Sequence, residues 1–211
     1  MSLSFKLIVI IFPIVIFCLL LVIILLQLKI FHVTKFTKKR NKLNVTSQDA
    51  IIDFFNNLSS VLVYLSTKQI GALIIIENHD NLQMYIDSGR KVNVPFFPEF
   101  IVNIFDNHNS PLHDGAIIIR NFTIVSLSSY LPTTNRELPV GYGSRHRASF
   151  GISEQYDCYS FIVSETTGAI SCMHNGIQTK LSNKSDQIKN QIYLLLRDNS
   201  IFSNVLMKKQ F

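Results

Sequence analysis

The sequence predicts a mixed α/β domain, with one central sheet flanked by helices, preceded by a single N-terminal transmembrane helix. The first observation is a set of short apolar runs typical of strands, at residues 70–77, 115–120, 122–131, 158–164 and 168–175. The second is helical spacing of apolar residues before and between these runs. Because strands alternate with helices and also follow one another as hairpin-like pairs, we expect a mixed sheet.

The N-terminal segment is apolar over the thickness of a bilayer. Residues 7–26, LIVIIFPIVIFCLLLVIILL, carry no charge, and a helix of about 20 residues spans roughly 30 Å. The alternative is a cleaved signal peptide, whose apolar region is usually about 7–15 residues and ends at small residues. Here a basic run follows instead. We therefore expect an uncleaved anchor over residues 1–31 and a basic juxtamembrane linker over residues 32–45.

The charge distribution sets the expected orientation and excludes one class of partner. One lysine precedes the apolar span, and six Lys or Arg residues follow it by position 42. The positive-inside rule therefore predicts a single-pass cell-membrane protein whose domain lies in the cytoplasm. After position 42 the chain has 13 basic and 14 acidic residues, so the net charge of +6 arises at the N-terminal end. Without a basic stripe in the globular part, nucleic acid is not an expected partner.

The first half of the globular part begins with a long helix. A connecting helix over residues 46–66 has apolar residues at helical spacing. The apolar run IGALIIIE, 70–77, is a buried strand, and turn signals with a short strand around residues 82–86 follow it. A short helix is expected within FPEFIVNIFDN, residues 97–107, and the strand 115–120 comes next.

The second half alternates strands and helices. Asn121 turns the chain into the strand 122–131, and a loop leads to a helix that begins near Ser144. ETTG joins the next two strands, and a terminal helix covers residues 183–199. The expected domain therefore extends over residues 67–199, with a tail at residues 200–211.

Three polar stretches stand at the ends of these elements. They are PLHDG (111–115) before a strand, GSRHRAS (143–149) at the start of a helix, and SETTG (164–168) between two strands. In the second stretch, a helix N-terminus with Ser144 suits phosphate, and Arg145 and Arg147 add forked donors for phosphate oxygens. A solvated, charged helix face is the simpler alternative.

The other two stretches carry acidic residues beside turns. His113 and Asp114 suit a divalent cation or the polarisation of a hydroxyl. As an alternative, Asp114 is an ordinary turn residue before glycine and His113 a structural histidine. Glu165 is open to the same two interpretations. The remaining histidines, His32, His79, His108 and His174, show no partner pattern and are expected at the surface.

Taken together, PLHDGA, RHRA and SETTG resemble the signature of the diadenylate cyclase family, the DAC domain of the DisA and CdaA type. The resemblance runs from about Ile70 to Leu181 and includes IGALIIIE, YIDSG, SPLHDGAIII, YLP, RHRASFGISE and FIVSETTGAIS in order. The single N-terminal span is similar to that of the CdaM type of mycoplasmas. The resemblance implies a DAC-type fold, with residues 67–199 as the catalytic domain.

The resemblance also implies the reaction. The family condenses two ATP molecules into cyclic di-AMP and releases two pyrophosphates. Each 3′-hydroxyl attacks the α-phosphate of the other nucleotide, so two active sites face each other in a homo-oligomer that is at least a transient dimer. Positioning and charge neutralisation supply most of such catalysis, and the implied cofactor is Mg²⁺ or Mn²⁺.

Carried over to matching positions, the resemblance assigns roles to residues. Asp114 is expected to orient or deprotonate the ribose hydroxyl, Tyr130 to stack on adenine, and the Leu131 backbone to read the base edge. The expected catalytic residues are Asp114, Arg145, His146, Arg147 and Glu165. The expected metal ligands are His113, Asp114 and Glu165. The expected ATP contacts are Gly115, Ala116, Tyr130, Leu131, Ser144, Arg145, Arg147 and Ser164.

Two positions depart from the family pattern. Ser144 stands where threonine is common, which keeps the hydroxyl. Thr166 stands where membrane-bound relatives commonly have a second glutamate, a departure that bears on metal preference.

Two other classes of function remain open. A non-catalytic, membrane-tethered nucleotide sensor would use the same fold, but it has no need of an acid at the ribose hydroxyl. A structural membrane adaptor would bind no nucleotide.

Overall fold

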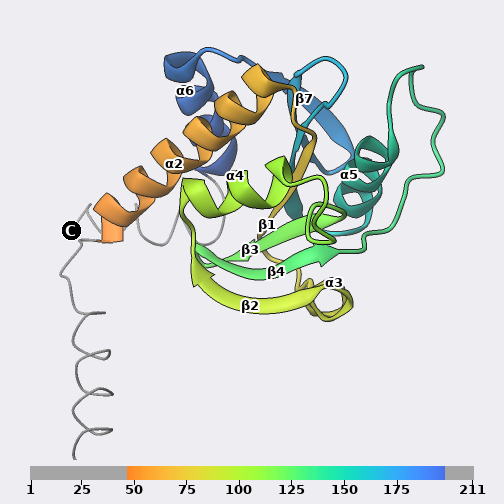
Figure 1. Cartoon of the computed structure of the whole chain (residues 1–211), viewed down its shortest axis with the longest axis horizontal. Coiled ribbons are helices and arrows are strands. Elements are labelled where there is room, and N and C mark those ends of the chain that lie inside the picture. Colours follow the sequence, from red (N-terminus) through yellow and green to blue (C-terminus); the bar gives the residue numbers. More distant parts are fainter. Residues whose placement is uncertain (1–46, 198–211) are drawn as a thin grey trace, which may run out of the picture. The chain divides into compact units, whose positions relative to one another are not determined.

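The computed structural model describes residues 47–197 (Figure 1). The expected anchor, the basic linker and the C-terminal tail lie outside the described residues. Within residues 47–197, no helix has the length and apolar character needed to cross a membrane.

A seven-stranded mixed sheet forms the centre of the described chain, as the sequence predicts. Its order is β2-β4-β3-β1-β5-β6-β7. β1 runs parallel to β3 and antiparallel to β5, and all other neighbours are antiparallel. The strands are β1 (Ala72–Glu77), β2 (Arg90–Pro95), β3 (Ala116–Arg120), β4 (Thr123–Ser129), β5 (Cys158–Val163), β6 (Ile170–His174) and β7 (Ile177–Leu181).

The three central strands are apolar because both of their faces are covered. Every residue of β1 and β5 is buried, and so are the first four of β3. Successive side chains of a strand point to opposite faces. Ile74 and Ile76 of β1 thus belong to one buried cluster, while Leu73 and Ile75 belong to another.

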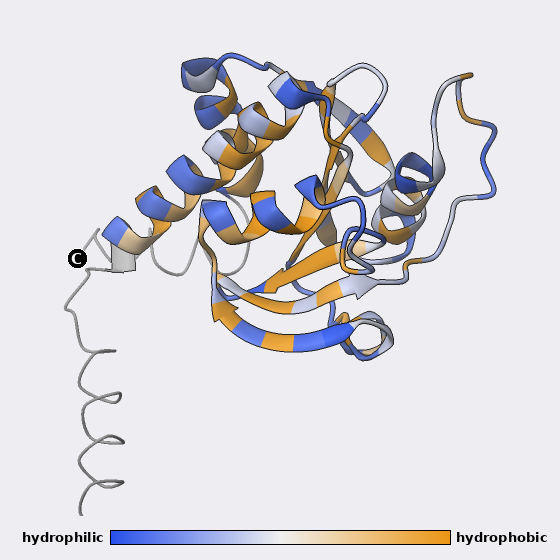
Figure 2. Cartoon of the chain, viewed as in Figure 1, coloured by the Kyte–Doolittle hydropathy of each residue, from blue (hydrophilic) through white to orange (hydrophobic). Residues whose placement is uncertain are grey.

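Helices cover both faces of the sheet. The cluster with Ile74 and Ile76 also contains buried residues of α2 (Ser47–Lys68), α4 (Pro98–Asp106) and α6 (Ser185–Leu196). The other cluster contains residues of α3 (Gln83–Ser88) and α5 (Ser144–Gln155). Figure 2 shows hydrophobic residues concentrated on the strands, whereas α2 and α4 each carry hydrophilic residues along one side.

Three elements differ from the sequence-based expectation. The segment expected as a strand around residues 82–86 is helix α3, because Leu82, Tyr85 and Ile86 are buried at helical spacing. The strands β2 and β7 were not expected. Both lie at the edges of the sheet, where polar and charged residues are frequent and hide the strand pattern.

Candidate active site

The three polar stretches meet at one end of the sheet. The stretch 111–115 precedes the parallel strand β3, and the stretch 164–168 follows β5, which runs antiparallel to β1. The start of β3 and the end of β5 therefore lie at the same end of the central strands. The N-terminus of α5 brings the third stretch to this end. Each polar stretch could be identified in the sequence, but their proximity in space could not, because it depends on the order of the strands in the sheet.

Arg145 joins all three stretches. Its Nη1 lies 3.0 Å from Oε2 of Glu165, and its Nη2 lies 3.0 Å from Nε2 and 3.2 Å from the carbonyl oxygen of His113. The Nε atom of Arg145 is buried and has no hydrogen-bond partner among the described residues. A buried, unsatisfied N–H is unfavourable, so this side chain offers a charged donor to an acceptor that is absent from the described chain.

His113 is held by both of its ring nitrogens. Nδ1 lies 2.6 Å from the carbonyl oxygen of Phe105, and Nε2 lies beside Arg145. The side chain is buried, with its ring centroid 4.5 Å from that of His108. Both ring nitrogens of His113 thus have a partner within the described residues, and its expected role as a metal ligand stays a prediction. It acts here as a partner of Arg145.

The start of α5 forms the next part of the site. The amides of His146 and Arg147 both donate to the carbonyl oxygen of Gly143, while Ser144 and Arg147 are exposed. The His146 ring stacks on Tyr142 with centroids 4.3 Å apart, and burial lowers the pKa of His146 below its ordinary value. The Tyr142 hydroxyl donates to Oε1 of Gln178 over 2.9 Å. The loop before α5 is thereby tied to β7.

A polar cavity of about 240 Å³ lies between α5 and the stretch 164–168. Ser164, itself buried, accepts at Oγ from the amide of Thr167 over 3.3 Å, which shapes the turn that carries Glu165. The residues that line the cavity are Gly141, Gly143, Ser144, Arg145, His146, Val163, Ser164, Glu165 and Thr166. Five of the predicted site residues thus line one polar cavity: Ser144, Arg145, His146, Ser164 and Glu165.

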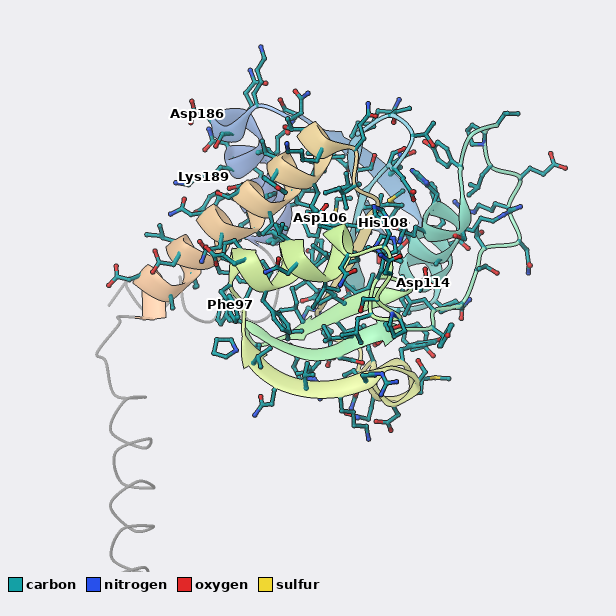
Figure 3. All side chains as sticks on the ribbon, in the orientation of Figure 1. Phe97, Asp106, His108, Asp114, Asp186 and Lys189 are labelled. Carbon is teal, nitrogen blue, oxygen red and sulfur yellow. The ribbon has the colours of Figure 1, made fainter. Side chains whose placement is uncertain are left out.

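Asp114 directly follows His113 in the stretch 111–115. It is exposed, and its carboxylate has no hydrogen-bond or ion-pair partner within residues 47–197. Figure 3 shows Asp114 with Asp106 and His108 in the region between the end of α4 and the sheet. Gly115 follows with φ +84°, and a Cβ there would lie 2.8 Å from backbone atoms of Ser128 and Ser129. The glycine is needed for this close approach.

A second cleft of about 360 Å³ reaches Pro111, in the stretch 111–115. Tyr130, whose exposure is 72%, lines it together with Ser88, Gly89, Arg90, Pro111 and Ser128. The Tyr130 amide donates to Oγ of Ser88 over 3.1 Å, which fixes the backbone before Leu131. Ala116 lies buried below, at the start of β3. Arg90 could not be predicted from the sequence because β2 carries only a weak strand pattern.

Two histidines expected as unpartnered surface residues have a shared partner. His79 Nδ1 lies 2.7 Å from one oxygen of Asp157, and His174 Nε2 lies 3.0 Å from the other. Asn78 also donates to both oxygens. His79 is exposed, as expected, and His174 is half-buried. Their shared partner could not be predicted because the three segments meet only in the folded sheet. Across the described range, no group of three or more His, Cys, Asp or Glu side chains is arranged to hold a metal ion.

The chain is similar to known proteins over the segment that carries the three polar stretches. The family described as "DAC: DisA bacterial checkpoint controller nucleotide-binding" matches residues 59–178. A diadenylate cyclase of Mycoplasma pneumoniae is 48% identical over 162 residues, which cover 77% of this chain and 79% of the relative.

Two solved structures are also similar. The crystal structure of DacA from Staphylococcus aureus has a TM-score of 0.63 and 35% identity, covering 70% of this chain and 95% of that one. A hypothetical membrane-spanning protein from Bacillus cereus has a TM-score of 0.57 and 36% identity, covering 60% of this chain and 62% of that one.

Proposed function

The chain belongs to the DAC family and is a diadenylate cyclase, and from this premise we propose how its residues perform the reaction. The enzyme is a nucleotidyltransferase that condenses two ATP molecules into cyclic di-AMP and releases two pyrophosphates. The observation that carries the proposal is the position of Arg145, which links His113, Glu165 and the polar cavity at one end of the central strands.

We propose that Asp114 is the base for the ribose 3′-hydroxyl. Its exposed carboxylate has no partner within the described chain, so it is available to accept a proton. The O–H bond breaks, the proton passes to the carboxylate, and the oxygen bonds to the α-phosphorus of the other nucleotide. The bond from that phosphorus to its bridging oxygen breaks, and pyrophosphate leaves with the electron pair. The same step on the second nucleotide closes the ring.

We propose that the cavity of about 240 Å³ holds the phosphates. The unsatisfied Nε of Arg145 supports this assignment, because a phosphate oxygen would accept from it. Ser144 and Ser164 add hydroxyl donors, and Arg147 adds charge at the exposed start of α5. His146 closes the wall of the cavity through its stacking on Tyr142.

We propose that the adenosine lies in the second cleft. The exposed ring of Tyr130 offers a face for the base, and stacking on aromatic side chains is a common way to hold a nucleobase. The Leu131 backbone would then read the base edge. Gly115 lets the backbone after Asp114 approach that of Ser128, which lines this cleft, so the sugar would lie beside Asp114.

A divalent cation, Mg²⁺ or Mn²⁺, suits the carboxylates of Asp114 and Glu165. Hard cations of this kind are often held by one or two carboxylates together with substrate phosphates, rather than by a cage of protein ligands. The free carboxylate of Asp114 fits that donor set, whereas both ring nitrogens of His113 have protein partners. When bound, the cation would neutralise charge on the phosphates.

We propose that catalysis requires two copies of the chain. Each copy as described offers one phosphate cavity and one Asp114, so a single copy holds half of the reactants. We further propose a cell-membrane location with the catalytic domain in the cytoplasm. The apolar residues 7–26, the basic residues after them and the likeness to a membrane-spanning protein support this location.

One experiment tests these proposals together. Purified chain is incubated with ATP and either Mg²⁺ or Mn²⁺, and the products are separated by chromatography at several enzyme concentrations. We expect cyclic di-AMP and pyrophosphate, with a specific activity that rises with enzyme concentration as dimers form. Bound but unchanged ATP would contradict the catalytic assignment, and a specific activity independent of self-association would contradict the dimer.

A further inference from the structure

We propose that the junction between α2 and β1, residues 66–71, is a positioning element that fixes the Glu165–Arg145 pair. The inference rests on the proposed role of that pair at the phosphates. Neither Ser66 nor Gly71 lines the phosphate cavity, so the junction would act through the pair rather than on the substrate.

The junction leaves α2 in a fixed geometry. The amide of Ile70 donates to the carbonyl oxygen of Leu65 over 2.8 Å, and the amide of Gln69 donates to that of Ser66 over 3.1 Å. With Gln69 at φ 53°, these two bonds form a Schellman motif at the helix end. Leu65 and Ile70 are both buried in the same cluster, which adds the hydrophobic contact typical of the motif. The path from Ser66 to Gly71 is therefore well determined.

Ser66 holds the turn that carries Glu165. Its Oγ donates to the carbonyl oxygen of Gly168 over 2.6 Å in a buried position, across 102 residues of sequence. The amide of Gly168 in turn donates to the carbonyl oxygen of Ser164 over 2.9 Å. Ser66 is therefore connected, through Gly168, to both ends of the turn that carries Glu165. A Cβ at Gly168 would lie 2.5 Å from the Ser66 carbonyl oxygen. Figure 1 shows the end of α2 beside the connection from β5 to β6.

Gly71 provides the space in which the pair lies. A Cβ at this buried position would be 2.6 Å from Nη1 of Arg145 and 3.0 Å from both Cβ and Oε2 of Glu165. A long side chain normally yields to such a contact, but this guanidinium is also held at His113. A methyl group at Gly71 would therefore separate Arg145 from Glu165. Ser66 and Gly71 thus constrain the same pair from two sides, one by a bond and one by the absence of a side chain.

The test compares Ser66→Ala and Gly71→Ala with the control Ser59→Ala in the full chain. Ser59 is also a buried serine of α2, but its hydroxyl bonds to the carbonyl oxygen of Asn56 within the helix. For each variant, kcat and KM for ATP are measured at saturating Mn²⁺, together with the thermal unfolding midpoint.

We expect Ser66→Ala to lower kcat by roughly fivefold or more, since loss of one buried hydrogen bond is typically about 1 kcal/mol. Gly71→Ala should lower kcat further, and Ser59→Ala should stay within about twofold of the parent. All three variants should remain folded at the assay temperature. If Gly71→Ala fails to fold, the kcat of Ser66→Ala alone tests the proposal, because this substitution only removes the hydroxyl oxygen and introduces no steric clash.

The proposal is overturned if Ser66→Ala keeps the parent kcat, or if Ser59→Ala loses as much activity as Ser66→Ala. The second result would indicate general weakening of α2. An inactive parent would instead contradict the proposed function, so the two failures are distinguishable. A crystal structure of Gly71→Ala with Nη1 of Arg145 still about 3 Å from Glu165 would also overturn the inference.

Discussion

Nη2 of Arg145 lies 3.0 Å from Nε2 of His113, and the opposite ring nitrogen of His113 lies 2.6 Å from the carbonyl oxygen of Phe105. Arginine can only donate, so Nε2 of His113 accepts, and Nδ1 carries the hydrogen and donates it to the carbonyl oxygen of Phe105. The ring therefore connects the end of α4 to the start of α5. This chain of bonds gives Arg145 a fixed direction before any substrate arrives, which favours catalysis by preorganisation.

The first prediction separates a positioning role of His113 from a metal-binding role. We expect His113→Ala to lower the free energy of unfolding by about 1–3 kcal/mol, because a buried carbonyl and a guanidinium lose their partner. The loss should be equal with and without Mn²⁺ in a denaturant titration. The control is His108→Ala, whose exposed ring packs beside His113 but has no side-chain hydrogen bond among the described residues, so its loss should cost less. A loss that is seen only with the metal present would show that His113 is a ligand.

The second prediction concerns Asp114. We expect Asp114→Asn to lower turnover by about 10²–10⁴-fold, the usual contribution of a positioned base, because an amide cannot accept the proton. Affinity for a non-reactive ATP analogue, measured by calorimetry, should change little. Asp106→Asn is the matched control, since Asp106 is a nearby exposed acid at the end of α4. Normal turnover in Asp114→Asn would remove this residue from the mechanism.

The sequence was informative where one feature dominates a segment. Unbroken apolar runs predicted the central strands β1, β3 and β5, because strands buried on both faces contain few polar residues. The edge strand β2 was not predicted because it is short and only Val92 and Val94 pack against the core. Helix α3 was mistaken for a strand because it is only six residues long, which leaves too few apolar positions to distinguish the two periods.

The same contrast holds for the site. PLHDG, GSRHR and SETTG were recognisable as polar stretches, and their resemblance to one family supplied the roles. The contacts of Arg145 and the shared partner of His79 and His174 depend on strand order, which no local pattern encodes. The sequence predicted Gly71 only as part of a strand. The role of its missing side chain becomes evident only when the neighbouring atoms of Arg145 and Glu165 are known.

The third prediction tests the base-stacking role of Tyr130. We expect Tyr130→Ala to raise KM for ATP by roughly tenfold, because stacking of one base contributes about 1–3 kcal/mol. Tyr130→Phe should stay close to the parent, since it keeps the ring. Tyr64→Ala, which removes another exposed ring on α2, serves as the control. Equal KM values for the alanine variant and the parent would place the adenine elsewhere.

The fourth prediction concerns acid stability at Asp157. Desolvation by burial raises the pKa of Asp157, but hydrogen bonds from Asn78, His174 and His79 outweigh it, so the pKa lies below its ordinary value. The unfolded chain therefore binds a proton at this residue at higher pH than the folded chain does. The contribution to stability is present above the ordinary aspartate range, near pH 4, and is lost as pH falls through the lowered pKa.

Asp157→Asn should therefore lower the free energy of unfolding by about 1–2 kcal/mol at pH 7, with a smaller difference from the parent near pH 3. The measurement is a series of denaturant titrations between these two pH values. Asp87→Asn is the control: the pKa of Asp87 is also lowered, chiefly by its bond to Lys91, but the side chain is exposed and solvent screens the pair. A difference between parent and Asp157→Asn that stays constant from pH 7 to pH 3 would show that the carboxylate charge does not stabilise the fold. A constant difference would also mean that the hydrogen bonds to Asn78, His79 and His174 hold the segments together regardless of ionisation.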